Sequence, residues 1–163
     1  MPDPIHPALV HLPIALAILI PGLALFWIVL IQRDFLPARS WAVLVLLQAL
    51  LVGSGWLALE TGEEQEDRVE RFVAERHIEA HEEAAERFLL LAGLGLLASG
   101  AGLLPRRAGR SGRMVGALAS FVVLAAGFSV GHSGGELVYV HGAATAYVDP
   151  SGTGAADWIH EDD

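Results

Sequence analysis

Four long apolar runs, separated by charged segments, dominate the pattern of this chain. They cover residues 8–31, 41–59, 88–104 and 114–131. About 20 consecutive apolar residues cross the hydrocarbon core of a bilayer as an α-helix. A soluble bundle is the alternative, but each of these helices would then need burial on every face. We therefore predict an all-α fold, an integral membrane four-helix bundle with a polar helical segment outside the membrane.

The largest polar segment lies between the second and third runs. Residues 63–87 contain mostly helix formers and neither Pro nor Gly. Pairs such as Glu64 and Arg68 have the favourable acid-before-base separation of four residues. This pattern predicts an amphipathic helix over residues 63–87, which runs into the third span or lies across the end of the bundle. We divide the chain into a membrane domain, residues 1–145, and an acidic C-terminal tail, residues 146–163.

Composition narrows the function classes. The chain has 163 residues, of which 53% are hydrophobic and 7% aromatic, and it contains no cysteine. Disulfides, thiolate metal sites, cysteine-held iron–sulfur clusters and covalently attached c-type haem are therefore excluded. All ten cationic residues are arginines, and they face nineteen carboxylates. This balance disfavours a nucleic-acid partner and leaves the lipid bilayer as the expected environment.

The charges between the runs predict an orientation. The loops that follow the first and third runs hold six arginines and a single Asp. The positive-inside rule places these loops in the cytoplasm. Both termini and the acidic segment are then extracytoplasmic, as in a multi-pass protein of the bacterial inner (cytoplasmic) membrane.

Small residues predict close contacts between the spans. Glycines recur in the third run, and Gly127 and Gly131 form a GxxxG pattern in the fourth. In lipid, such residues let helix backbones approach each other. Packing within one chain and formation of a homo-oligomer are both consistent with the pattern.

All histidines fall on the side assigned as extracytoplasmic, which suggests a shared site. They are His6, His11, His77, His81, His132, His141 and His160. His11 lies about one turn inside the first span, where a polar side chain needs a partner. His81 precedes the third span closely, whereas His77 is expected to be more exposed to solvent.

The segment from Gly131 to Gly142 (GHSGGELVYVHG) offers a further candidate ligand. Gly134 and Gly135 permit either a tight turn or the close approach of something bulky. After a turn there, residues 137–140 would follow the membrane interface, with Tyr139 at a depth that suits its ring. His141 would then return towards the bundle; a purely structural turn is the alternative. Within the whole sequence, no nucleophile elbow, phosphate loop or dinucleotide fingerprint occurs, so we assign no catalytic residue.

Three stretches together resemble a known family. The opening HPALVHLP, the His81–Glu82 pair and the closing GGELVYVHG are similar to the bacterial membrane-protein family called domain of unknown function 2231, over about residues 4–145. Leu12 stands where Phe is usual in that family. The resemblance implies a four-span protein. Because some similar domains occur beside cytochrome c or Rieske-type modules, it also implies electron transfer and b-type haem. The motif residues here are His6, His11, His81, Gly134, Gly135, Tyr139, His141 and Gly142.

The leading hypothesis is a small redox membrane protein that binds b-type haem, with electron transfer as its function. Neutral imidazoles in a dry apolar slot are what haem requires. The candidate ligands are His6, His11, His81 and His141, and Arg87 is a candidate partner for a haem propionate.

Two alternatives remain. The same four histidines suit a haem-free Zn, Cu or Fe ion. The chain could instead be a non-catalytic accessory subunit of a larger membrane complex. Its acidic face would then bind a basic partner such as a soluble cytochrome.

Overall fold

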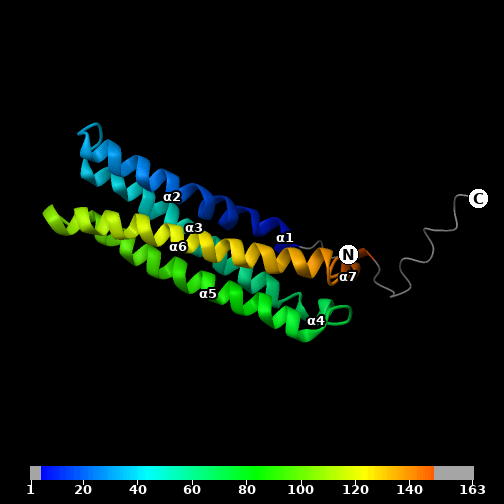
Figure 1. The fold of residues 1–163 in the computed structure, drawn as a ribbon. Coiled ribbons are helices and arrows are strands. Elements are labelled where there is room, and N and C mark those ends of the chain that lie inside the picture. Colours follow the sequence, from blue (N-terminus) through cyan, green and yellow to red (C-terminus); the bar gives the residue numbers. More distant parts are fainter. Residues whose placement is uncertain (1–4, 149–163) are drawn as a thin grey trace, which may run out of the picture.

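The fold is an elongated bundle of four long helices (Figure 1). A computed structural model describes residues 5–148, and in this part of the chain there is no β-strand. The long helices are α2 (His11–Gln32, preceded by the short α1, Ile5–Leu9), α3 (Ala42–Glu63), α5 (Glu75–Gly100) and α6 (Arg106–Tyr139). Each is long and apolar enough to cross a membrane, so the prediction of a four-helix membrane bundle is confirmed.

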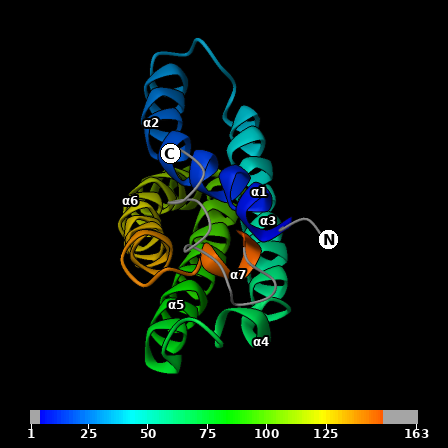
Figure 2. The ribbon, with the colours of Figure 1, turned by 90° about the vertical axis from the view of Figure 1, so that its right-hand side faces the viewer.

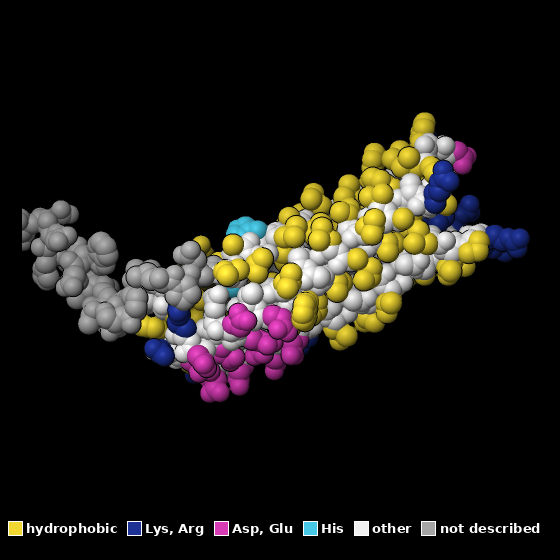
Figure 3. Space-filling view, turned by 180° about the vertical axis from the view of Figure 1, so that it is seen from behind, with side chains coloured by type: hydrophobic (Ala, Val, Ile, Leu, Met, Phe, Trp, Pro, Cys, Tyr) yellow, Lys and Arg dark blue, Asp and Glu magenta, His cyan; other side chains and the backbone are white. Residues whose placement is uncertain are grey.

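The short elements lie at the two ends of the bundle. The 3₁₀ helices η1 (Ala38–Trp41) and η2 (Ala101–Leu103) lie at one end, which we call the basic end; its arginines are Arg33, Arg39, Arg106, Arg107, Arg110 and Arg113. At the opposite, acidic end are α1, α4 (Glu66–Val69), α7 (Thr145–Val148) and the carboxylate-rich residues 60–87 (Figures 1 and 2). Figure 3 shows most of the visible carboxylates gathered at one end, with apolar side chains along the middle.

The long helices extend beyond the apolar runs. α6 has 34 residues, which corresponds to about 50 Å at 1.5 Å per residue, whereas the hydrocarbon core is only about 30 Å thick. α6 is therefore longer than one crossing of the hydrocarbon region requires. Its first two turns carry the arginines that, in the sequence, had suggested a loop.

The predicted single polar helix over residues 63–87 is only partly correct. α3 continues to Glu63, α4 is a single turn, and a helix that enters the third span begins only at Glu75. The chain turns between α4 and α5 and buries Val73, which is 3% exposed, beside Leu137 and Ala143. Burial of an aliphatic side chain contributes about 1.5–3 kcal/mol, more than the roughly 0.2–0.5 kcal/mol of a helical ion pair. Burial of Val73 thus outweighs the ion pairs that would favour one continuous helix, and the helix is interrupted there.

α7 also shifts the boundary proposed between domain and tail. Ala146, beyond the predicted boundary at residue 145, is buried, and the Tyr147 hydroxyl donates a hydrogen bond to the Gln65 side chain. Residues 146–148 therefore belong to the packed bundle, because α7 covers its acidic end (Figure 2). The rest of the predicted tail, residues 149–163, lies outside the described part of the chain.

The outer surface of the bundle is apolar along the spans. Only 22–33% of the residues in the most apolar window of each span are buried inside the protein. Large side chains such as Leu97 and Phe128 are 72% and 78% exposed. Lipid tails solvate such residues without cost, whereas water does not. The exposed apolar surface supports the same membrane assignment as helix length does.

The interior holds two apolar clusters and a few buried polar groups. Leu51, Phe88 and Ala92 belong to the cluster nearer the acidic end, and Trp41 belongs to the cluster at the basic end. The Trp41 indole N–H donates to the Ser99 carbonyl at 2.9 Å. This bond ties η1 to the end of α5, where the apolar surroundings make an unpaired N–H costly.

Glycines in α6 allow the closest helix contact. A Cβ atom added at Gly109 or Gly112 would overlap the backbone of residues 101–104, and one at Gly116 would lie 2.9 Å from Ser99 Cα. These three positions form one face of α6, which packs on η2 and the end of α5. Gly131, by contrast, faces open space. The GxxxG pattern of Gly127 and Gly131 is therefore not the face on which this contact depends.

We expect Gly112→Ala to destabilise the protein, because its methyl group would force backbone segments apart. Overpacking of this kind costs about 1–3 kcal/mol. Gly131→Ala, the matched control, has nothing within 4 Å of the added carbon and should leave stability unchanged or slightly raised. Thermal unfolding of the two variants in the same detergent measures the difference. Equal melting temperatures would contradict this account of the contact between α6 and η2.

Candidate functional site

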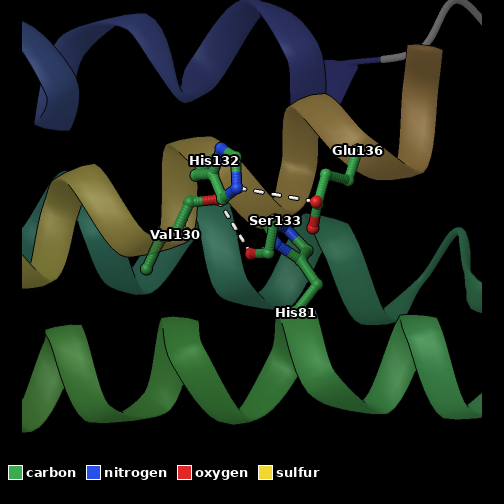
Figure 4. A network of polar contacts seen from close by, with 5 residues as sticks. All are labelled: His81, Val130, His132, Ser133 and Glu136. Carbon is green, nitrogen blue, oxygen red and sulfur yellow. Dashed lines mark hydrogen bonds and ion pairs between the residues drawn. The ribbon is translucent and has the colours of Figure 1, made fainter. Parts of the chain in front are cut away.

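His81 on α5 points towards α6, where it contacts Ser133 (Figure 4). Its Nδ1 atom lies 2.8 Å from the Ser133 hydroxyl oxygen. That hydroxyl donates to the Val130 carbonyl at 3.0 Å. A hydroxyl can both donate and accept, so when Ser133 donates to Val130 it accepts a hydrogen bond from the Nδ1–H of His81. In that tautomer the lone pair of His81 is on Nε2.

A glycine makes room for the His81 ring. A Cβ atom at Gly134 would lie 3.1 Å from His81 Cε1. The close approach that the sequence allowed at this position is therefore made to the imidazole of His81. Gly135, the neighbouring candidate, has nothing within 4 Å of an added Cβ atom.

His6 on α1 is held in a similar way at the end of α3. Its Nδ1 atom lies 2.8 Å from the Ala58 carbonyl oxygen, which can only accept a hydrogen bond. The Thr61 hydroxyl donates to the Leu57 carbonyl and lies 3.4 Å from the same ring nitrogen. A Cβ atom at Gly62 would lie 3.2 Å from His6 Cε1, so this ring too lies against a glycine. His6, like His81, therefore keeps its proton on Nδ1 and its lone pair on Nε2.

These two histidines form the candidate site. His6 lies within electrostatic range of His81, and both are partly buried at the acidic end. A ring whose Nδ1–H is bonded to a protein acceptor is oriented and has a more basic Nε2, the usual state of a metal-ligating imidazole. The arrangement offers two oriented Nε2 donors from helices far apart in sequence.

The remaining predicted site residues lie elsewhere. His11 is exposed, with Nδ1 3.3 Å from the Ala8 carbonyl of the preceding turn. Arg87 forms an ion pair with Glu83 on the surface, at 2.5 Å. Tyr139 is 89% exposed. Between residues 5 and 148, no three His, Asp or Glu side chains converge to hold a metal ion.

His141 pairs with His77 instead. The two rings stack with centroids 3.8 Å apart and planes inclined by 18°. The predicted turn at Gly134 and Gly135 is wrong, because α6 continues as a helix to Tyr139. The chain turns at Gly142, whose φ of +76° lies in the left-handed region. Because α6 continues to Tyr139, His141 lies just beyond its end and stacks on His77 in the first turn of α5.

Two features of this site were missed at the level of the sequence. Ser133 was not identified as a partner for a histidine ring, although it lies one residue before Gly134, where the ring of His81 packs. The Ala58 carbonyl carries no sequence signal, since any residue supplies the same backbone group.

A shallow hollow of about 570 Å³ lies on the outer face of α3 and α5 rather than between the histidines. Its walls are mostly leucines, and Gly93 and Glu86 also line it. Because it opens to the apolar surface of the spans, lipid tails would fill it.

Glu66 lies among other carboxylates at the acidic end. Burial, together with the neighbouring carboxylates of Glu82 and Glu70, raises the pKa of Glu66. Burial also raises the pKa of the Tyr147 hydroxyl, although Arg68, 5.6 Å above that ring, acts in the opposite direction. The short α4 thus holds a carboxylate where its charged form is disfavoured.

We expect Glu66→Gln to stabilise the protein at neutral pH. A Glu whose pKa is raised on folding makes the folded state less stable once it is ionised, and this cost disappears as pH falls through the folded-state pKa. The gain in melting temperature should therefore shrink between neutral pH and the 4.5 of an unperturbed Glu. Thermal unfolding across this range measures it.

The matched control is Glu79→Gln, which removes an exposed carboxylate from the nearby α5. Its effect should be smaller and should depend less on pH. If both variants behave alike at every pH, the stabilisation reflects only the net charge of this end.

Comparison with known proteins gives one match. The profile of a family described as "Predicted membrane protein (DUF2231)" matches residues 2–147. No curated protein and no solved structure matches the chain.

Proposed function

The chain belongs to the DUF2231 family of predicted membrane proteins, and we propose that it is a small membrane redox protein that binds b-type haem through His6 and His81. The observation that carries this proposal is the state of the two rings. Each has Nδ1 2.8 Å from an oxygen of another helix, and in the tautomer that donates Nδ1–H the lone pair of Nε2 remains for a ligand. Two such donors are what six-coordinate haem iron takes from a protein.

The donor set suits haem better than a bare ion. Zn²⁺ or Cu²⁺ bound only by imidazoles requires three or four of them, whereas haem supplies four ligands itself. The glycines beside the rings, Gly62 and Gly134, keep side chains away from His6 and His81. Haem bound here would supply one-electron transfer. The polypeptide would orient both imidazoles and keep them in the tautomer that can ligate iron.

The charges of the two ends suggest the orientation of the protein in the membrane and the kind of redox partner that it would bind. We place the basic end in the cytoplasm by the positive-inside rule and the acidic end outside it. Carboxylates around the site would attract a basic soluble redox partner and speed its association at low ionic strength.

We expect the purified full-length protein, expressed with adequate haem supply, to show a Soret band that shifts on reduction. His81→Gln should remove most of the bound haem, because the ring that donates Nε2 is lost. The control is His132→Gln, which changes an exposed histidine of α6 whose Nε2 lies 3.5 Å from the Glu136 carboxylate. Absorption spectra and haem content per chain, with circular dichroism to confirm folding, measure the outcome.

The same preparation separates the alternatives. If the folded protein has no Soret band but contains stoichiometric Zn, Cu or Fe, the site binds a metal ion instead of haem. If the folded protein contains neither haem nor a metal ion, a resident cofactor is rejected and the accessory-subunit hypothesis is favoured.

We also expect Ser133→Ala to weaken haem binding about tenfold, the lower end of the 10–100-fold range for losing such a partner. Without the acceptor, His81 becomes less basic and stabilises ferric iron less, so the midpoint potential should rise. Ser129→Ala, an exposed position one turn earlier on α6, is the control. An unchanged potential in Ser133→Ala would show that His81 is not an axial ligand.

A further inference from the structure

The basic end contains a second candidate site, independent of the histidines. A hollow of about 200 Å³ lies between the end of α2 and the first turns of α6. Ile28, Ile31 and Met114 form its apolar part, and Asp34, Arg110 and Arg113 are among its polar residues. The volume is below the roughly 300–1,000 Å³ of sites for drug-sized ligands and suits a small polar group.

One of the two arginines is fixed by the fold. The Arg113 Nη1 atom donates to the Gly102 carbonyl at 2.7 Å, and the side chain is partly buried. A guanidinium has five N–H donors, so this bond leaves others for a ligand in the hollow. Because Arg113 is already ordered, binding costs less side-chain entropy than at a free surface arginine.

The arginines of this end have no carboxylate partner in the described structure. Both ion pairs found between residues 5 and 148, Arg87–Glu83 and His132–Glu136, lie towards the acidic end. Asp34 lines the hollow without pairing with Arg110 or Arg113. Its backbone φ of 59° lies in the left-handed region, at the turn after α2. The six arginines of the basic end thus outweigh this one carboxylate.

The depth of the hollow indicates where its ligand comes from. Next to Met114 on α6, Val115 and Leu118 are 54% and 65% exposed and belong to the lipid-facing surface. A group held by Arg110 and Arg113 therefore lies at the boundary between headgroups and acyl chains. Basic pockets between spanning helices at this depth suit anionic lipid headgroups.

We propose that this hollow binds the phosphate group of an anionic phospholipid, with Arg110 and Arg113 as the donors and the acyl chains along the apolar face of α6. Arginine suits this role because its planar fork matches two phosphate oxygens. Asp34 opposes the ligand's charge and limits its affinity. Phosphatidylglycerol fits this arrangement better than a zwitterionic lipid, since it carries no cation to be repelled by the arginines.

The test compares lipids bound to the delipidated full-length protein in detergent, by native mass spectrometry. We expect phosphatidylglycerol to bind more tightly than phosphatidylcholine with the same acyl chains. Arg110→Gln should weaken phosphatidylglycerol binding about fivefold, from roughly 1 kcal/mol per arginine near the headgroups. Arg107→Gln, an exposed arginine outside the lining of the hollow, is the matched control and should change it little. Asp34→Asn should strengthen it.

Three results would overturn the proposal. Equal loss in the Arg110 and Arg107 variants would show a diffuse basic surface instead of a site. Equal retention of the two lipids would show that charge is not recognised. Displacement of bound phosphatidylglycerol by millimolar inorganic phosphate, with matched sulfate as ionic-strength control, would identify a site for free phosphate.

Discussion

Helices surrounded by lipid gain little from burying apolar side chains against each other, and this constraint shapes the whole bundle. Their association relies on close packing and on polar bonds that lipid cannot replace. The contact between α5 and α6 is the most extensive between the described elements, and a face of α6 without side chains lies at its end. Gly109 and Gly112 bring α6 against η2, and Gly116 brings it against Ser99 of α5. Trp41 and Ser99 add a buried hydrogen bond beside this contact.

That contact fixes the register of α6 along α5, and the register determines the site. With Gly116 against Ser99 at one end, the antiparallel course of the two helices places Ser133 and Gly134 opposite His81 at the other end. A slip of one residue on α6 would turn Ser133 away by about 100°. The oriented imidazole of His81 is thus a consequence of helix packing many turns away.

Much of the architecture could be predicted from the sequence because bilayer thickness imposes helix length. The four spans follow from apolar runs alone. The ends of the helices do not, because arginines at the start of α6 and carboxylates at the start of α5 resemble loops in a hydropathy pattern. For the same reason the spacing of Gly109, Gly112 and Gly116 was not recognised as a helix face.

For the histidines too, sequence position predicts one part of the arrangement and tertiary packing decides the rest. Their gathering at one end follows from where they lie relative to the spans, so it could be predicted. Which of them meet depends on register and on the course of the chain after α6. Because α6 continues through Gly134 and Gly135 and turns only at Gly142, His141 reaches His77 instead of His81.

The two ends of the bundle place different demands on their polar groups. At the acidic end, each of two imidazoles has one nitrogen bonded to the protein. The other nitrogen can donate a lone pair to a ligand. At the basic end, the arginines offer only donors, and the protein supplies a single nearby carboxylate. A ligand there must bring its own negative charge. Between them, the glycine face of α6 against η2 and the end of α5 sets the register that places both arrangements at their ends of the bundle.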